Sequence, residues 1–436
     1  MKKKAISIAN NRVFNNASWI IGCKLAQSAF ALLINALTAR YFGPTTFGLI
    51  NYAASLVAFV TPIMTLGTTE VLVNEIIRRP QEEGAVLGTS IVMTFVSSLC
   101  CIGGIYAFVR IAHPGDNVTL FVTILYSLLL IAQCAEQIQY WFHAKFLSKY
   151  VSLTSFFVYV VISAYKMILL VMKKSVYWFA VSNSLDYLLI AIALCVLYYL
   201  KAGQKLSFSL SIAKSLWNAG KHYIIPGLMG LVLAQSDRVM LRFMCGETEV
   251  GFYSAAISIA TLSSFVFSAL ITSFRPSILE AKTKNIVSYE TELINLYSIV
   301  IYMSLAIAVG LTILALPITT ILYGDAFEKT SVILRIAVWY TPFSYIGGVR
   351  MVYILAEDKQ QYLWIISLTG MMLNIALNLI FIPQMSGYGA ALATTITQIF
   401  TNVVIVYLIK PIRKNLSYVI KGFDPRCLLG ICWMHK

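Results

Sequence analysis

Eight ionisable side chains lie inside stretches of the chain that are otherwise apolar. They comprise five cations and three carboxylates, namely Lys24, Lys166, Arg238, Arg335, Arg350, Glu136, Asp186 and Asp237. Desolvated lysine and arginine bind phosphate oxygens strongly. Because the cations outnumber the carboxylates, this set favours an anionic substrate, whereas the carboxylates are candidates for proton or ion coupling.

Several of these groups share a helical face with neutral polar residues. Such polar stripes are typical of helix surfaces that face other helices or water. They therefore predict a hydrated polar cavity. The Asn, Gln, Thr and Tyr side chains in it would suit the hydroxyl groups of a sugar. The stripes include Gln27, Ser28 and Asn35 with Lys24; Ser155, Tyr159 and Ser163 with Lys166; Gln133 and Gln137 with Glu136; and the later residues Asn374, Asn378, Thr394, Thr397, Gln398 and Thr401.

The depth of each group leaves two interpretations open. Lys24, Lys166, Glu136, Arg335 and Arg350 lie close enough to predicted helix ends for the side chain to reach water instead of a substrate. Asp186 is the deepest, about nine residues or roughly 13 Å from the nearer end. We interpret Lys24, Lys166, Arg238, Arg335 and Arg350 as substrate-binding residues, and Asp186 and Glu136 as ion-coupling residues.

Asp237 and Arg238 are neighbours in the sequence and therefore point about 100° apart on a helix. They do not form a simple mutual pair. We expect Asp237 to fix its helix end to a neighbouring helix, while Arg238 faces the substrate.

The composition excludes an ordinary soluble protein. Of the 436 residues, 59% are hydrophobic and only 12% are charged, compared with about 45–50% apolar residues in soluble domains. The four histidines and eight cysteines show no metal-ligand spacing, so no metal and no cofactor is expected. The natural solvent for this chain is lipid.

Apolar windows of about 20 residues, the length that crosses a bilayer, occur twelve times. We expect twelve transmembrane helices at residues 17–39, 47–67, 85–109, 119–140, 150–172, 177–200, 217–241, 250–274, 293–323, 332–355, 362–382 and 387–408.

The basic residues predict the orientation of these helices. MKKKAISIANNR is too polar for a signal peptide, and if it is cytoplasmic, 22 of the 33 lysines and arginines lie on its side and only six on the other. This asymmetry predicts that both termini are cytoplasmic. The net charge of +15 is thereby explained by orientation and contact with membrane lipids, without nucleic acid as a partner.

Two loops of the chain repeat each other. ARYFGPTTFGLINYAAS at 39–55 corresponds to RFMCGETEVGFYSAAIS after Leu241 with an offset near 203 residues, and each joins the first helix of a six-helix half to the second. This predicts two six-helix bundles related by a pseudo-two-fold axis along the membrane normal. The expected domains are 1–200, a cytoplasmic linker at 201–216, 217–410, and a cytoplasmic tail at 411–436.

Three strings carry a family resemblance: ARYFGPTTFGLINYA, QSDRVMLRFMCGETEVGFYSAA at 235–256, and GYGAALATTITQ at the twelfth helix. Over residues 12–410 the chain resembles the polysaccharide and O-antigen flippases of the multidrug/oligosaccharidyl-lipid/polysaccharide exporter superfamily, which has a MATE-like fold. The resemblance implies a bacterial inner-membrane protein that moves an undecaprenyl-diphosphate-linked oligosaccharide to the periplasmic leaflet. It also implies alternating access around a cationic cavity and coupling to an ion gradient. Polysaccharide polymerase machinery is a candidate partner.

The family motifs correspond to Asp237 and Arg238 and, in the first loop, to Arg40, Gly43 and Gly48. An organic-cation antiporter of the same superfamily is the main alternative, although its cavity would favour acidic residues. A membrane polymerase or glycosyltransferase is less favoured because no outside loop exceeds about ten residues and no DxD motif, nucleophile elbow or P-loop occurs. We therefore expect a transporter and not an enzyme.

Overall fold

The computed structural model describes the backbone of residues 2–201 and 203–428, with side chains described for residues 22, 23, 26–201 and 203–426. Within this part the regular structure is helical and no strand occurs. A helix satisfies its own backbone hydrogen bonds, which is what an apolar chain in lipid requires.

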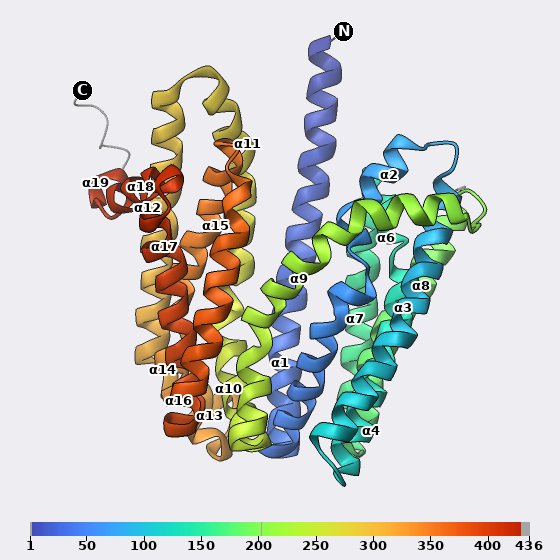
Figure 1. Cartoon of the computed structure of the whole chain (residues 1–436), viewed down its shortest axis with the longest axis vertical. Coiled ribbons are helices and arrows are strands. Elements are labelled where there is room, and N and C mark those ends of the chain that lie inside the picture. Colours follow the sequence, from blue (N-terminus) through green and yellow to red (C-terminus); the bar gives the residue numbers. More distant parts are fainter. Residues whose placement is uncertain (1, 202, 429–436) are drawn as a thin grey trace. The chain divides into compact units, whose positions relative to one another are not determined.

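The first of two compact units comprises Met1–Phe42 and Thr46–Gln235. Figure 1 shows its helices α3, α4, α7 and α8 side by side. The helices that lie wholly or partly in this unit are α1 (Lys2–Met64), α2 (Leu72–Arg78), α3 (Glu83–Ala112), α4 (Asn117–Ser127), α5 (Leu129–Glu136), α6 (Gln139–Ala144), α7 (Ser148–Val171), α8 (Val176–Leu200) and α9 (Leu210–Cys245).

The second unit comprises Gly43–Thr45 and Ser236–Lys436, so the division falls inside α9. Its long helices run side by side, and the short α18 and α19 lie beside α12 (Figure 1). The helices after α9 are α10 (Glu247–Ala260), α11 (Ser264–Lys284), α12 (Ile286–Ile313), α13 (Ala315–Tyr323), α14 (Glu328–Ala337), α15 (Tyr340–Ala356), α16 (Leu363–Ile399), α17 (Ile405–Leu408), α18 (Lys414–Gly422) and α19 (Pro425–Leu428).

Nine segments of the described chain are long and apolar enough to cross a membrane, or ten if the bent pair Asp325–Ala337 and Tyr340–Ala356 forms one span. The two longest, Ala26–Met64 with 39 residues and Gln360–Leu408 with 49, have about twice the length that one crossing of about 20 residues needs. Both contain a non-helical residue, Gly43 in α1 and Ser386 in α16. If each forms two crossings and the bent pair forms one, the number is twelve, as predicted from the sequence.

The two repeated loops have the same backbone conformation. Gly43 has φ 73° and ψ 174°, and Gly246, which stands 203 positions later, has φ 91° and ψ 177°. Only glycine adopts this region without strain, so the repeat is present in the backbone geometry as well as in the sequence.

Segment 203–209 packs along α3 in the first unit. The Gly84 N–H donates to Gln204 Oε1 at 3.1 Å, and the Ser209 N–H donates to Thr89 Oγ1 at 3.0 Å. A side chain at Gly84 would collide with the carbonyl of Lys205, so the close approach depends on glycine. Helix α9 begins at Leu210, and residues 210–216 of the predicted linker are therefore helical.

Candidate functional site

A polar cluster in the first unit unites three of the predicted site residues. Lys166 on α7 donates from Nζ to Asn183 Oδ1 on α8 at 2.8 Å. The Lys166 ammonium also interacts electrostatically with Asp186, and Asp186 interacts with Glu136 at the end of α5. All four side chains are half-buried. One cation thus lies among two carboxylates and an amide within apolar helices.

Helix packing explains why these residues meet. Asn183 and Asp186 are three positions apart and share a face of α8, which packs against both α5 and α7. Asp186 Oδ1 is buried and has no hydrogen-bond partner among the described residues. A buried oxygen of this kind can accept a proton, a small cation or a substrate hydroxyl.

A second cluster surrounds Asp237 in the second unit. The carboxylate is only 3% exposed. It accepts hydrogen bonds from Asn378 Nδ2 at 2.6 Å, from Thr394 Oγ1 at 2.6 Å and from the Tyr253 hydroxyl. The partners belong to α10 and α16, so Asp237 connects the end of α9 to both of these helices.

The cluster continues along α16 through neutral groups. Ser236 Oγ donates to Asn374 Oδ1 at 2.8 Å, and Asn378 Nδ2 reaches the same oxygen at 3.1 Å. Asn378 Oδ1 is buried without a hydrogen-bond partner in the described structure. Carboxylate, amide and hydroxyl oxygens are the ligands that hard cations prefer. No group of three or more His, Cys, Asp or Glu suited to a metal occurs within the described residues.

The predicted cations of the second unit lie in three different settings. Arg238 is half-buried and donates from Nε to Ser254 Oγ at 3.1 Å. Arg350 is 9% exposed and donates from Nη1 to the Thr401 main-chain oxygen at 2.7 Å. Thr401 belongs to the π-helical turn Phe400–Val404. Arg335 on α14 is exposed.

The remaining predicted residues belong to the first loop or its helix. The Lys24 side chain lies outside the described residues. Arg40 is exposed, Gly43 forms the break described above, and Gly48 is buried. Within the second unit, Thr45 Oγ1 lies 2.9 Å from Thr248 Oγ1, a pair separated by the same 203 positions as the repeat.

The structure thus groups Lys166, Asp186 and Glu136 in one unit and surrounds Asp237 with neutral donors in the other. Sequence reasoning missed Asn183 as the partner of Lys166, although its spacing from Asp186 on an apolar helix is a usable signal. It also missed Tyr253 as a partner of Asp237. That residue stands inside the GFYSAA string, where the sequence alone does not show that its hydroxyl turns toward α9.

Comparisons with known proteins agree on the class of protein. A sequence-family model described as "Polysaccharide biosynthesis protein" matches residues 13–282. An uncharacterized membrane protein of Methanocaldococcus jannaschii is 25% identical over 50% of this chain, and the match spans only 46% of that relative.

Solved structures show the same fold at low sequence identity. An inward-facing multidrug resistance MATE family transporter of the MOP superfamily has a TM-score of 0.68 at 14% identity, covering 90% of this chain and 96% of the other. The lipid II flippase MurJ in an inward closed conformation has a TM-score of 0.65 at 16% identity, covering 92% and 90%. A MOP superfamily transporter from Pyrococcus furiosus has a TM-score of 0.63 at 12% identity, covering 94% and 96%. The prediction of a two-bundle, all-α membrane fold is confirmed.

Proposed function

Because the chain belongs to the family of polysaccharide biosynthesis proteins, we propose that it is a flippase for undecaprenyl-diphosphate-linked oligosaccharide. The substrate would be an O-antigen or related polysaccharide repeat unit, carried from the cytoplasmic to the periplasmic leaflet of a bacterial inner membrane. Both termini would be cytoplasmic. The likeness in fold to a lipid II flippase supports a lipid-linked substrate.

The observation that carries this proposal is the way in which Arg350 is held inside the second unit. Its hydrogen-bond partner in the described chain is a main-chain carbonyl and not a carboxylate. A cation among neutral partners keeps its charge available for a phosphate group, and a diphosphate brings the charge that would compensate it.

Substrate contacts are assigned to Lys24, Lys166, Arg238, Arg335 and Arg350, with alternating access exposing them to one leaflet at a time. Arg350 is nearly enclosed in the present structure, so this assignment requires the second unit to open around it. The polar residues near both clusters suit the hydroxyls of a sugar chain.

Ion coupling is assigned to buried carboxylates. Asp186 and Glu136 lie in one electrostatic cluster, so a proton or cation taken up by one alters the charge sensed by the other and by Lys166. The neutral, oxygen-rich surroundings of Asp237 make this residue a third candidate. Its motif position and its bonds to two helices also suit a structural role.

An organic-cation antiporter is the alternative function, because the fold likeness covers a multidrug transporter as well as a flippase. The three buried or half-buried carboxylates would suit a cationic passenger. The excess of cations over carboxylates within the apolar segments favours the anionic lipid instead.

The test is transport of a fluorescent undecaprenyl-diphosphate-linked oligosaccharide in vesicles reconstituted with the purified chain. The Lys166→Gln and Arg238→Gln variants should each translocate the substrate about tenfold more slowly. Each variant would lose a charge-assisted hydrogen bond to the diphosphate, worth about 1.5 kcal/mol or more. Lys205→Gln, an exposed residue of segment 203–209, is the matched control and should keep the wild-type rate. Wild-type rates in a Lys166→Gln, Arg238→Gln double variant would contradict the proposal, and uptake of an organic cation instead would favour the antiporter.

A further inference from the structure

The chain after the last long helix is basic and amphipathic. Residues 409–428, IKPIRKNLSYVIKGFDPRCL, contain five basic residues and one acidic residue. Helix α18 buries Asn415, Tyr418, Val419 and Gly422, which recur at the spacing of one helical face. We call residues 409–426 the α18 segment.

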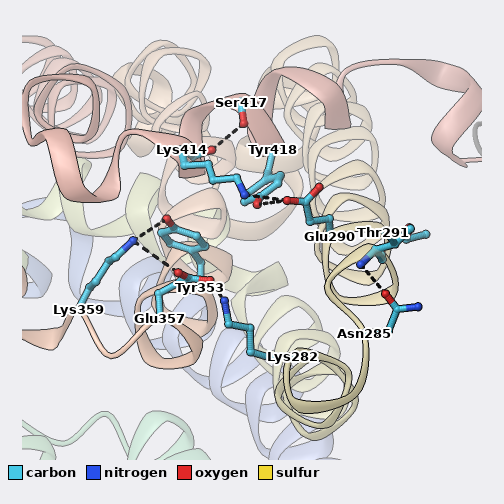
Figure 2. Close-up of polar contacts among 11 residues, drawn as sticks. Lys282, Asn285, Glu290, Thr291, Tyr353, Glu357, Lys359, Lys414, Ser417 and Tyr418 are labelled. Atoms are coloured by element: carbon cyan, nitrogen blue, oxygen red, sulfur yellow. Dashed lines mark hydrogen bonds and ion pairs between the residues drawn. The ribbon is translucent and has the colours of Figure 1, made fainter.

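Hydrogen bonds and an ion pair fix the inner face of α18 to α12, as Figure 2 shows in part. Lys414 Nζ lies 2.8 Å from Glu290 Oε1, and the Tyr418 hydroxyl donates to the same oxygen at 2.9 Å. Two turns further along α12, the buried Tyr297 hydroxyl donates to Asn415 Oδ1 at 2.7 Å. Because Tyr297, Asn415 and Tyr418 are buried, α18 is a docked helix rather than a loose tail.

The C-terminal end of α18 packs against α12 between Tyr297 and Tyr302. A Cβ at Gly422 would lie 2.9 Å from Tyr297 Cβ, so the two helices touch backbone to side chain there. The Tyr302 hydroxyl donates to the Phe423 carbonyl oxygen at 2.6 Å.

The sequence of α12 indicates where this contact lies relative to the membrane. No charged residue occurs from 293 to 324, and from Ile299 to Ile313 the helix is almost wholly apolar. A run of this kind is typical of the hydrocarbon region, whereas Glu290 stands before it. The α18 segment therefore extends from the charged part of α12 to the beginning of its apolar part, which is the position of a membrane interface.

The outer face of the segment combines apolar and basic groups. Ile420 is 64% exposed and Phe423 is 50% exposed. Lys410, Arg413 and Lys421 are also exposed. The Arg413 guanidinium lies 4.6 Å from the ring centre of Tyr407, which is itself 53% exposed at the end of the apolar span.

We propose that the α18 segment is a binding surface for the anionic headgroups of the phospholipid leaflet. Ile420 and Phe423 would enter the boundary between headgroups and acyl chains, and Lys410, Arg413 and Lys421 would lie at the level of the phosphates. The occupant is lipid because apolar and basic side chains alternate at the interface level of a docked helix, with Tyr407 as an aromatic anchor. The positive-inside pattern predicts that this leaflet is the cytoplasmic one.

The first test measures how phosphatidylglycerol stabilises the full-length chain in detergent micelles, with phosphatidylcholine as the neutral comparison. In the triple variant Lys410→Gln, Arg413→Gln, Lys421→Gln, the lipid concentration for half-maximal stabilisation should rise about tenfold or more. The matched control removes three exposed lysines elsewhere, Lys205→Gln, Lys214→Gln and Lys221→Gln, and should leave that concentration within about twofold of wild type. Equal responses of the two triple variants would overturn the proposal.

The second test measures depth and does not depend on charge. Spin labels at Ile420→Cys and, as control, Ser288→Cys, an exposed position in the charged part of α12, would be compared in nanodiscs of phosphatidylcholine and phosphatidylglycerol, using chains whose native cysteines are replaced. The label at position 420 should be accessible to oxygen and protected from a water-soluble relaxation agent, whereas the label at 288 should show the opposite. Water accessibility at both positions would overturn the insertion of this face, whether or not the charges bind lipid.

Discussion

At the scale of single residues, Asp237 is the acceptor on which the joint of α9, α10 and α16 depends. Asp237→Ala removes the acceptor of the Tyr253 and Thr394 hydroxyls, while Asn378 keeps its bond to Asn374, and we expect a loss of about 2 kcal/mol or more in the free energy of unfolding. Asp237→Asn retains one acceptor oxygen and should lose less. Thermal unfolding of the two variants in micelles measures this difference.

Asp237→Glu is the informative control, because it keeps the charge but moves the carboxylate by one methylene in a buried site. An alanine variant as stable as wild type would show that the hydrogen bonds seen around Asp237 do not hold the helices together. The same variants, assayed for transport, separate a structural role from ion coupling: Asp237→Asn would then be stable but insensitive to an ion gradient.

The pair of Lys282 and Glu357, shown in Figure 2, joins the ends of α11 and α15 outside the apolar spans. Burial by itself would raise the pKa of Glu357, but the Lys282 ammonium and Lys359, at 3.6 Å, outweigh burial, so the pKa lies below its ordinary value of 4.5. A carboxyl with a lowered pKa contributes stability above the unfolded pKa, and this contribution is lost as the pH falls through the folded value.

We therefore expect the stabilising effect of this pair to be complete at neutral pH and to be lost at acid pH, as the pH falls through the lowered folded pKa of Glu357. Lys282→Gln should remove about 0.5 kcal/mol at pH 7, a small value because solvent screens both side chains, and almost nothing at low pH. The measurement is thermal unfolding of both proteins across this range. Lys284→Gln, which removes the neighbouring lysine from an exposed pair with Glu280, is the control, and a pH-independent difference between wild type and Lys282→Gln would be inconsistent with the mechanism.

At the scale of helices, the contact between α18 and α12 is set by one glycine. Gly422→Ala would place a Cβ 2.9 Å from Tyr297 Cβ and 3.3 Å from the Ser298 nitrogen. Alanine normally favours a helix over glycine by about 1 kcal/mol. Here overpacking of about 1–3 kcal/mol opposes that gain, so we expect net destabilisation and easier proteolysis of the α18 segment.

Gly310→Ala is the matched control, because Gly310 lies in α12 with nothing within 4 Å of an added Cβ. This variant should be neutral or stabilised by up to about 1 kcal/mol. If both alanine variants had the same stability, the close packing of α18 on α12 would not exist in the membrane.

Helix starts and stops show what local sequence can predict. Gly43 followed by Pro44 predicts a break between two crossings, and the backbone breaks there. The beginning of α9 at Leu210 was not predicted, because SLSIAKS is as compatible with an amphipathic linker as with a helix. The docking of segment 203–209 on α3 removes that ambiguity, since it determines where the chain becomes free to start a new helix.

At the scale of the whole molecule, the asymmetry of lysine and arginine predicts which loops are cytoplasmic. Short peptide tags inserted after Gln81 and after Gly115 flank α3, whose 30 residues suffice for one crossing. In intact cells, an impermeant reagent should label the tag after Gly115, while the tag after Gln81 should be labelled only after permeabilisation. The reverse pattern would invert the orientation, and labelling of both tags would remove α3 as a crossing.

The sequence by itself determined the class of the molecule. An apolar chain must form helices in lipid because no other regular structure satisfies its backbone within one segment, and the 203-residue repeat indicated two related halves. It also located the ionisable residues, since charges stand out in apolar runs.

Only the tertiary structure decided which of these residues have partners. Lys166 and Asn183, or Asp237 and Thr394, are brought together by the rotation and packing of separate helices. Many different helix rotations satisfy the same pattern of apolar residues when lipid and neighbouring helices are equally apolar. Hydrogen bonds and close contacts in the folded chain, such as Gly422 against Tyr297, select one of them.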